Sequence, residues 1–213
     1  MMPQCREKER KDMRTQAPLK EITTDKNPGP RAKKAGPARN PATSTQITVS
    51  EIPTPIGPML AGATDKGLCL LEFVDKDSPE AQLAAIEKIF RARITQGNSP
   101  HLEAAFKQLE EYFSGRRKVF DLSLDMRGTP FQQDAWRALL AIPYGCTCSY
   151  QEQARSMGRP SAVRAVANAN GANPVSIIVP CHRVIGSNGT LTGYGGGLWR
   201  KKFLLDLEKR HSV

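Results

Sequence analysis

Short apolar runs separated by turn-forming residues open the patterned part of the chain. The runs at residues 47–52, 59–64 and 68–73 are rich in β-branched and aliphatic side chains, as strands are. Pro and Gly lie between them, at residues 54–58 and 65–67, where they favour tight connections. The pattern therefore predicts three neighbouring strands joined by turns.

Helical periodicity replaces the strand pattern after residue 78. Residues 79–93 and 100–113 are predicted to be helical. In the second segment, one helix face is expected to carry Leu102, Phe106, Leu109 and Phe113. Residues 118–124 alternate between apolar and polar side chains and predict a further strand. Together these elements indicate a small α/β domain over residues 47–125.

A second domain, residues 126–213, begins with a strong helix signal. Thr129 is suited to cap a helix, Pro130 to occupy its first position, and Gln132 to complete a capping box. The segment 142–145 contains Pro and Gly and should end this helix.

Two short helices around a tight turn come next. Residues 150–157 and 160–169 have helical composition, with a break at Gly158 and with Pro160 suited to the first position of the second helix. This is the spacing of a helix-turn-helix motif. Small residues surround Arg164 on the second helix: Ala162, Ala165, Ala167 and Ala169. Such a face allows close approach of another helix, which is the more common occupant, or of DNA.

A cysteine follows a β-branched run in the middle of the second domain. Residues 175–179 predict a strand buried on both faces, and Pro180, which cannot donate to a strand ladder, should end the pairing at Cys181. His182 is adjacent, and a neighbouring imidazolium favours the reactive thiolate. One interpretation is a nucleophile presented at a strand end. The other is an inert buried cysteine beside a surface histidine.

Composition separates the first 46 residues from the rest. They hold six of the 16 prolines and few large apolar residues, which predicts a disordered tail. The net charge is +6 in this tail, −1 over residues 47–118 and +5 over residues 119–213, within a total of +10. The basic patch at residues 30–34 is either a nuclear-targeting or DNA-tethering segment or simply part of a solvated linker. The basic last segment suits contact with phosphates.

Cysteine usage and hydropathy restrict the location and the cofactors. The five cysteines are an odd number without framework spacing, which indicates a reducing compartment. No apolar stretch reaches membrane-spanning length, and the N-terminus lacks a secretory apolar core. We therefore expect a soluble, intracellular protein without membrane contact, nuclear in a eukaryote and cytoplasmic in a bacterium. His101 is isolated, and we predict no metal and no cofactor.

Beyond these patterns, the segment NPVSIIVPCHRVIGSNGTLTGYGGGLWRKKFLLDLE resembles the active-site region of the O6-alkylguanine-DNA alkyltransferases. The resemblance extends upstream through FQQDAWRALLAIPYG, SYQEQARSMGRP and AVRAVANANGANP, and more loosely back to residue 47. It implies a ribonuclease H-like first domain and a mostly α-helical second domain with a helix-turn-helix. It also implies a monomer whose cysteine takes an alkyl group from guanine O6 in double-stranded DNA and keeps it. O4-alkylthymine is a second expected substrate.

The resemblance implies catalytic roles for individual residues. Cys181 is the alkyl acceptor, and a relay of Glu208, His182 and a water removes its proton. The second helix of the motif enters the minor groove, where Arg164 fills the gap left by the extruded nucleotide. Extrusion is needed because guanine O6 lies inside the stacked duplex. Tyr150 crowds the 3′ phosphate and donates a proton to the base.

The same resemblance assigns further contacts. On the DNA-contacting helix these are Ala162, Ala165 and Ala169. Asn173 bridges the helix-turn-helix and the segment with the cysteine. The expected substrate-binding residues are Asn173, Val184, Tyr194, Gly195 and Gly196.

Three features depart from the family pattern. Gln153 stands where many relatives have an apolar residue, which predicts different packing of the first helix of the motif. Gly195 stands where some members have a serine that can bond the alkylated oxygen. With Cys5 as the single cysteine of the first 46 residues, that segment cannot be the four-cysteine zinc domain of some members.

Two other classes of protein stay open at this stage. A lesion sensor without enzymatic activity would share the fold, but it would lack the reactive cysteine that Cys181 supplies. A cysteine hydrolase would use Cys181 and His182, but it would need an oxyanion hole and would leave Arg164 without a purpose.

Overall fold

The computed structural model describes residues 45–75 and 78–212. The tail predicted over residues 1–46, with its basic patch at 30–34, lies outside the described residues apart from its last two positions. In the described part of the chain, no helix is both long and apolar enough to cross a membrane.

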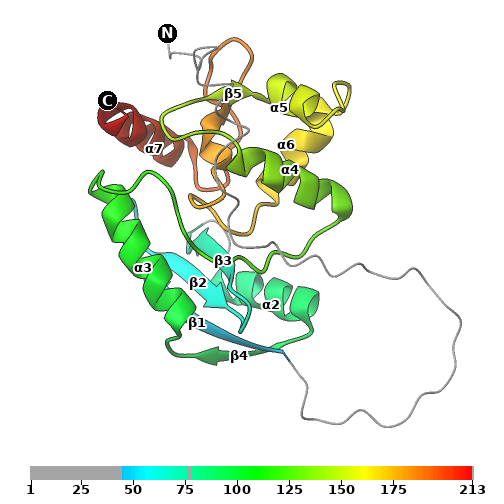
Figure 1. Ribbon diagram of the computed structural model, residues 1–213. Coiled ribbons are helices and arrows are strands. Elements are labelled where there is room, and N and C mark those ends of the chain that lie inside the picture. The colour runs from blue at the N-terminus through cyan, green and yellow to red at the C-terminus, as the bar shows by residue number, and fades with distance from the viewer. Residues whose placement is uncertain (1–44, 76–77, 213) are drawn as a thin grey trace, which may run out of the picture.

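A four-stranded mixed sheet forms the first domain (Figure 1). The strands are β1 (Gln46–Ile52), β2 (Met59–Ala63), β3 (Leu68–Phe73) and β4 (Arg93–Gln96), in the order β3-β2-β1-β4. β1–β2 and β2–β3 are antiparallel, with Val49 opposite Gly62, whereas β4 runs parallel to β1. The first three strands confirm the prediction, because apolar runs between Gly/Pro turns have few alternatives.

Strand β4 was not expected, because residues 79–93 were predicted to be one helix. Helix α2 (Pro79–Phe90) begins at a Ser78 cap and ends where Arg91 adopts a left-handed conformation with φ 50°. The left-handed residue terminates the helix and frees the following residues to pair with β1. The expected helix was therefore three residues too long, since α2 ends at Phe90 and β4 begins at Arg93.

Helix α3 (Pro100–Phe113) has the bounds that the sequence predicts, but it buries a different face. The buried residues are Leu102, Ala105, Leu109 and Tyr112. Phe106, which was expected on the inner face, is 38% exposed. The rotation brings Tyr112 into the interior, where it meets the second domain.

The strand predicted at residues 118–124 is wrong. Leu124 makes an isolated bridge with Leu68, and no strand forms there. The alternating burial is real, since Phe120, Leu122 and Leu124 are buried. Nearby backbone groups are satisfied by a side chain instead of a strand: Gln108 on α3 donates to the carbonyl of Asp121 and accepts from its amide. The alternating apolar pattern therefore reflects burial of every second side chain and not pairing with a neighbouring strand.

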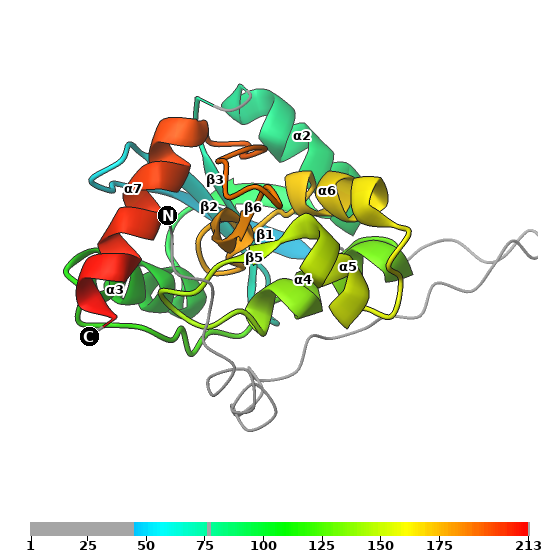
Figure 2. The same ribbon diagram turned by 90° about the horizontal axis from the view of Figure 1, so that it is seen from above.

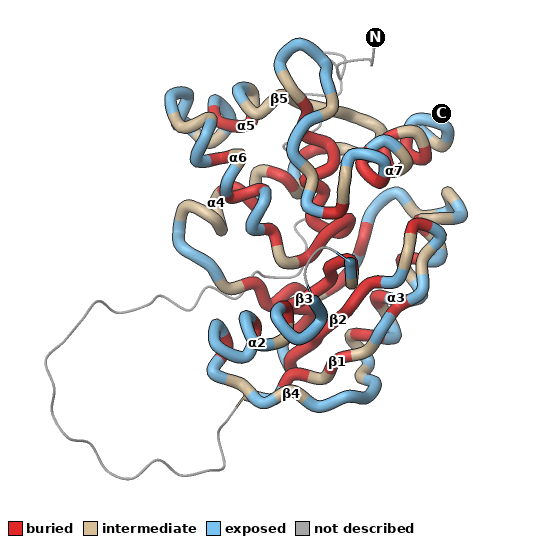
Figure 3. The backbone as a smooth tube through the Cα atoms, turned by 180° about the vertical axis from the view of Figure 1, so that it is seen from behind, coloured by how far each residue is buried: buried red, intermediate tan, exposed pale blue. Residues whose placement is uncertain are grey.

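Helices cover both faces of the sheet. One face packs on α2 through a cluster that includes Ile47, Leu70, Ile86 and Phe90. The other face packs on α3 and continues without a break into the core of the second domain. Figure 3 shows this as buried backbone that runs through the centre of the molecule.

The second domain consists of four helices and a two-stranded parallel ribbon. Its elements are α4 (Pro130–Leu140), β5 (Cys148–Ser149), α5 (Tyr150–Ser156), α6 (Val163–Gly171), the 3₁₀ turn η2 (Cys181–Arg183), β6 (Val184–Ile185) and α7 (Leu198–His211). The capping box of Thr129 and Gln132 at the start of α4 is confirmed. Seen from above, β5 and β6 lie between α7 on one side and α4, α5 and α6 on the other (Figure 2).

The predicted helix-turn-helix corresponds to α5 and α6. The second helix begins at Val163 and not at Pro160, which lies in the turn before it, and Ala162 occupies the cap position. Gly158 has φ 69°, a left-handed conformation that glycine adopts without strain, and it reverses the chain after α5.

Candidate functional site

The segment before Cys181 is buried, but it is a turn and not a strand. Val175 makes one bridge to Leu71, after which the Val179 amide bonds back to the Val175 carbonyl at 3.0 Å. Ile177 has φ 70°, which is uncommon and strained for a β-branched residue. The predicted strand, and the pairing that Pro180 was to end, are therefore wrong. The apolar composition reflects burial alone.

Asn173 holds this turn together. Its side-chain oxygen accepts from the Val175 amide at 3.0 Å, and its nitrogen donates to the Val179 carbonyl at 2.8 Å. The same nitrogen lies 3.4 Å from Cys181 Sγ. Asn173 lies two residues after the end of α6, so the thiol is tied through one amide to the helix-turn-helix. Its predicted bridging position is present in this geometry.

Cys181 opens the short η2 turn and is 8% exposed. The turn places His182 behind it, with its side chain fully buried. Burial lowers the pKa of His182, although Glu208 opposes that shift, so the imidazole is neutral near pH 7. His182 Nε2 lies 2.8 Å from Glu208 Oε1.

The protonation state of His182 follows from its partner. The pKa of Glu208 is lowered well below its usual value: burial alone would raise it, but the charge of Arg183, the charge that His182 carries in acid, and the hydrogen bonds that both residues donate outweigh burial. An ionised carboxylate only accepts, so His182 Nε2 carries the hydrogen. His182 Nδ1 is then the basic nitrogen, and within residues 45–75 and 78–212 it has no hydrogen-bond partner.

Glu208 is a buried anion with several donors. Arg183 reaches both carboxylate oxygens, at 3.0 Å from Nε to Oε2 and 3.0 Å from Nη2 to Oε1. The Gly145 amide donates to Oε2 at 2.9 Å, and the Tyr112 hydroxyl donates to Oε1 at 2.8 Å. Glu208 is 0% exposed, so it is not a solvated charge on the surface of α7.

Lys201 on α7 is a second buried charge, and the sequence did not single it out. Its ammonium donates to the carbonyls of Val184 and Thr192, each at 2.5 Å, and to that of Gly193 at 3.3 Å. Burial lowers the pKa of Lys201 to about 8, while Cys181 acts in the opposite direction. Lys201 thus joins β6 to the glycine-rich loop at residues 192–197.

Tyr150 opens α5 and lies against the same loop. Its hydroxyl donates to the carbonyls of Thr192 and Gly193, at 3.3 and 3.2 Å. Burial and the nearby Cys181 raise its pKa, so Tyr150 keeps its proton at neutral pH. The parallel pairing of Cys148 with Val184 brings this tyrosine next to η2.

The predicted substrate-binding residues lie in two different environments. Val184 is 0% exposed and belongs to the core, whereas Gly195 is exposed and Tyr194 is half-buried in the loop. Burial, with Cys181 nearby, raises the pKa of Tyr194. A Cβ on Gly196 would come 2.5 Å from the Phe73 ring, so glycine is required there by packing against the first domain.

The predicted DNA-contacting residues divide between surface and interior. Arg164 and Ala165 are exposed on α6, and Ala162 is half-buried at its cap. Ala169 is 3% exposed, and its carbonyl accepts from Trp136 Nε1 at 2.8 Å, so it packs on α4 and faces away from Arg164's surface. The interpretation as a helix-packing face therefore holds for Ala169, and contact of the exposed face with DNA stays a prediction.

Gln153 departs from the family pattern, and the structure gives it a polar partner inside the motif. Its amide exchanges two hydrogen bonds with the Asn170 amide, at 3.1 and 2.7 Å, and both residues are buried. It also donates to the Ala135 carbonyl at 3.1 Å. The pair links α5 to α6 and α4.

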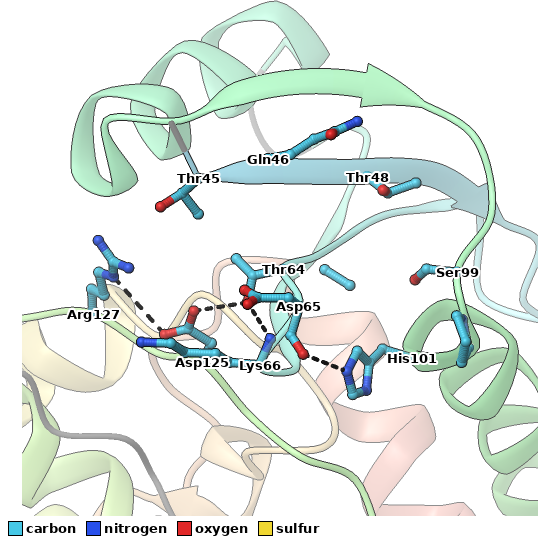
Figure 4. A pocket seen from close by; sticks show the side chains of 12 residues that line it. Thr45, Gln46, Thr48, Thr64, Asp65, Lys66, Ser99, His101, Asp125 and Arg127 are labelled. Carbon is cyan, nitrogen blue, oxygen red and sulfur yellow. Dashed lines mark hydrogen bonds and ion pairs between the residues drawn. The ribbon is translucent and has the colours of Figure 1, made fainter. Parts of the chain in front are cut away.

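A hollow of about 710 Å³ lies in the first domain and is lined by none of the predicted site residues (Figure 4). It contains His101, which contacts the Asp65 carbonyl, and the buried Asp125, which accepts from Thr64. Across the described ranges, no group of three or more His, Cys, Asp or Glu side chains is arranged to hold a metal.

The cysteine lies beside a neutral imidazole that is paired with a carboxylate, and one amide ties the cysteine to the helix-turn-helix. This arrangement defines the class of protein: a DNA-binding protein with a cysteine nucleophile. Residues 47–126 match the ribonuclease-like domain of 6-O-methylguanine DNA methyltransferase, and residues 130–210 match its DNA binding domain. This chain belongs to the 6-O-methylguanine DNA methyltransferase family. The expected ribonuclease-like first domain and helical second domain are confirmed.

Similar proteins come from bacteria and archaea. The chain is 47% identical over 166 residues to a methylated-DNA–protein-cysteine methyltransferase of Mycolicibacterium paratuberculosis, covering 78% of this chain and 94% of the relative. It is 48% identical over 162 residues to that of Methanosarcina barkeri, covering 75% and 96%. A crystal structure of Mycobacterium tuberculosis OGT in complex with DNA matches with a TM-score of 0.67 and 45% identity, covering 78% of this chain and 94% of that one.

Sequence reasoning missed three residues of the site: Tyr112, Arg183 and Lys201. A signal existed for one of them, because Lys201 precedes the buried Leu204, Leu205 and Glu208 at helical spacing. For Tyr112 no local signal existed, since its partner lies 96 residues away.

Proposed function

We propose that this protein repairs O6-methylguanine in DNA by moving the methyl group to Cys181. The observation that carries this proposal is the position of Cys181 Sγ, 3.4 Å from the Asn173 amide and adjacent in the chain to the buried His182–Glu208 pair. Membership of the family supports O6-methylguanine in DNA as the substrate class. The geometry supports Cys181 as the acceptor of the methyl group.

In the proposed reaction the thiol loses its proton before or as it attacks. His182 Nδ1 accepts that proton through a water, and Glu208 stabilises the imidazolium that results. The thiolate sulfur then attacks the methyl carbon in line, so that a C–S bond forms while the C–O6 bond breaks. Guanine leaves as an O6 anion that takes up one proton, for which Tyr150 is the proposed donor. The proton held by His182 then returns to Tyr150 through solvent, so the net result is methylcysteine and guanine.

A thioether offers no easy return path, so each protein molecule acts once. The acceptor is also only 8% exposed, so a stacked base could not reach it. We therefore propose that the nucleotide is extruded into the site, with exposed Arg164 of α6 in the minor groove and Tyr150 beside the phosphate. We also propose that the protein repairs O4-alkylthymine by the same transfer to Cys181.

The test is mass spectrometry of the protein after incubation with a duplex that carries one O6-methylguanine. We expect a mass gain of one methyl group, saturating at one per molecule, on the peptide that contains Cys181. Cys181→Ser should bind the duplex and gain nothing, whereas Cys146→Ser should behave like the unchanged protein. Binding without modification of the unchanged protein would indicate a lesion sensor and contradict the proposal. Repeated turnover without modification would indicate a hydrolase.

A further inference from the structure

The first domain contributes a side chain to the charged cluster behind the thiol. Tyr112, near the end of α3, is 0% exposed, and its hydroxyl donates to Glu208 Oε1 at 2.8 Å. The same oxygen accepts from His182 Nε2, also at 2.8 Å. One carboxylate oxygen therefore joins the first domain to the imidazole of the second.

The other hydrogen bonds to Glu208 come from the second domain. Arg183 and the Gly145 amide hold the carboxylate from η2 and from the connection between α4 and β5. Tyr112 approaches from the opposite domain and bonds to the oxygen that faces His182. It is therefore placed to set both the rotation of the carboxylate and the strength with which Oε1 attracts the imidazole proton.

Tyr112 can act only as a donor in this position. Burial, followed by the negative charge of Glu208, raises the pKa of Tyr112 well above its usual value, so the phenol stays protonated. Its ring is fixed by neighbouring aromatic rings, in edge contact with Tyr144 at 5.9 Å and tilted against Phe120 at 5.3 Å between centroids. The hydroxyl is thus held rigidly toward Glu208.

We propose that Tyr112 is a positioning residue for methyl transfer, whose hydroxyl fixes Glu208 so that His182 is held as the neutral imidazole with Nδ1 ready to accept a proton. This inference rests on the function proposed above, because it assigns Tyr112 a part in the same relay.

The charges around this pair determine the sign of the expected effect. Glu208 faces Tyr112 from α3, Tyr144 from the α4–β5 connection, and His182 and Arg183 from η2. Without the Tyr112 hydroxyl, the carboxylate has one donor fewer and attracts the His182 proton more strongly, so the imidazolium persists to higher pH.

The remaining charges near His182 stay in place when that hydroxyl is removed. The positive charges of Arg183 and of Lys201 on α7 still oppose protonation of His182, as they do in the unchanged protein. The change of one hydroxyl therefore isolates the contribution of Tyr112.

The experiment is the pH dependence of single-turnover transfer from an O6-methylguanine duplex to Tyr112→Phe. We expect the acidic limb of the profile to move to higher pH by about half to one unit, which corresponds to the net free energy of one ordinary hydrogen bond. Tyr144→Phe is the matched control: its hydroxyl is buried and has no hydrogen-bond partner in the described part of the chain, so its profile should not move.

A second readout does not depend on transfer. The ¹⁵N resonances of the His182 ring report which nitrogen carries the hydrogen, and in Tyr112→Phe the ring should become doubly protonated at higher pH than in the unchanged protein. Replacement of Tyr112 by 3-fluorotyrosine, a more acidic phenol and stronger donor, should move both readouts in the opposite direction.

The outcomes separate this inference from the proposed function. A slower reaction with an unchanged pH profile and unchanged ¹⁵N titration would mean that Tyr112 is merely structural, and would overturn the inference. So would shifts of equal size in Tyr144→Phe. If the unchanged protein does not methylate Cys181, the proposed function fails, while the ring resonances still decide whether Tyr112 controls His182.

Discussion

At the scale of single residues, the site depends on buried charges whose partners are well defined. Glu208 is satisfied by Arg183, His182, Tyr112 and a backbone amide, and Lys201 by three carbonyls. A buried charge is tolerated when it is paired or fully hydrogen-bonded, and removal of one partner leaves the other uncompensated.

Glu208→Gln tests the anion. The amide keeps the shape of the side chain but loses the charge, which leaves the Arg183 guanidinium buried without its counter-ion. We expect the free energy of unfolding to fall by about 3–5 kcal/mol, measured by urea denaturation at pH 7. The control variant is Glu152→Gln, which makes the same substitution at a half-buried position of α5. Equal losses in the two variants would contradict the assignment of Glu208 as the central anion.

The lowered pKa of Glu208 also predicts a pH dependence of stability. In the unfolded chain the pKa of a glutamate is about 4.3, whereas in the folded protein the Glu208 carboxyl stays ionised to much lower pH. Its contribution is therefore complete above about pH 4.3 and is lost progressively as the pH falls toward the folded-state pKa. Between pH 6 and pH 3 the unchanged protein should lose about 1–2 kcal/mol more than Glu208→Gln. Parallel acid-unfolding curves for the two proteins would argue against this.

Lys201→Met tests the cation. Methionine has a similar length but cannot donate, so the carbonyls of Val184 and Thr192 lose a buried partner, at a cost of about 1–3 kcal/mol. We expect the loop at residues 192–197 to exchange its amide hydrogens faster and methyl transfer to slow by about tenfold, since about 1.4 kcal/mol corresponds to a factor of ten. Lys202→Met changes the neighbouring, 64% exposed lysine and should alter neither measurement.

At the scale of elements, the helix-turn-helix is stabilised by a polar contact where an apolar one would be expected. Gln153 and Asn170 bond reciprocally across α5 and α6. Such a pair is favourable only while both members are present, because either amide alone would be buried and unsatisfied.

Gln153→Leu should therefore destabilise the protein by about 1–3 kcal/mol in urea denaturation. Replacing both residues by leucine should recover part of that loss, because no amide is then left unpaired. Gln151→Leu, at an exposed position of the same helix, is the control and should be nearly neutral. If the double variant loses as much as the sum of the single ones, the two amides are not coupled.

At the scale of the whole molecule, the two domains are joined by buried polar contacts as well as by a shared core. Arg200 on α7 is 6% exposed, donates to the Ile56 carbonyl at 2.7 Å and stacks on the Phe73 ring at 4.2 Å. It also forms a two-pronged pair with Asp75, which is largely exposed and so adds little by itself. With Tyr112 and Glu208, these contacts couple the site to the first domain.

We expect the two domains to unfold in one calorimetric transition, because the larger core cluster is continuous between them. Arg200→Met should keep much of the stacking but lose the bond to Ile56, lowering stability by about 1–3 kcal/mol without splitting the transition. Two resolved transitions in the unchanged protein would contradict the shared core.

The sequence by itself determined the local features of this protein. Its first three strands, the ends of α3 and the capping box at α4 follow from turn residues, Pro positions and capping side chains within a few residues of one another. The motif around Cys181 likewise indicated the family, and it predicts the nucleophile and its histidine, because these residues are adjacent in the chain.

Only the tertiary structure decided which side chains complete the site. Tyr112 meets Glu208 across 96 positions, and Arg200 meets Ile56 across 144. The runs at residues 118–124 and 175–179 showed the same limit, since each has the composition of a strand but makes only one isolated bridge to β3. Apolar composition reports burial, which is a property of each residue, whereas pairing and charge compensation depend on what the rest of the chain brings alongside.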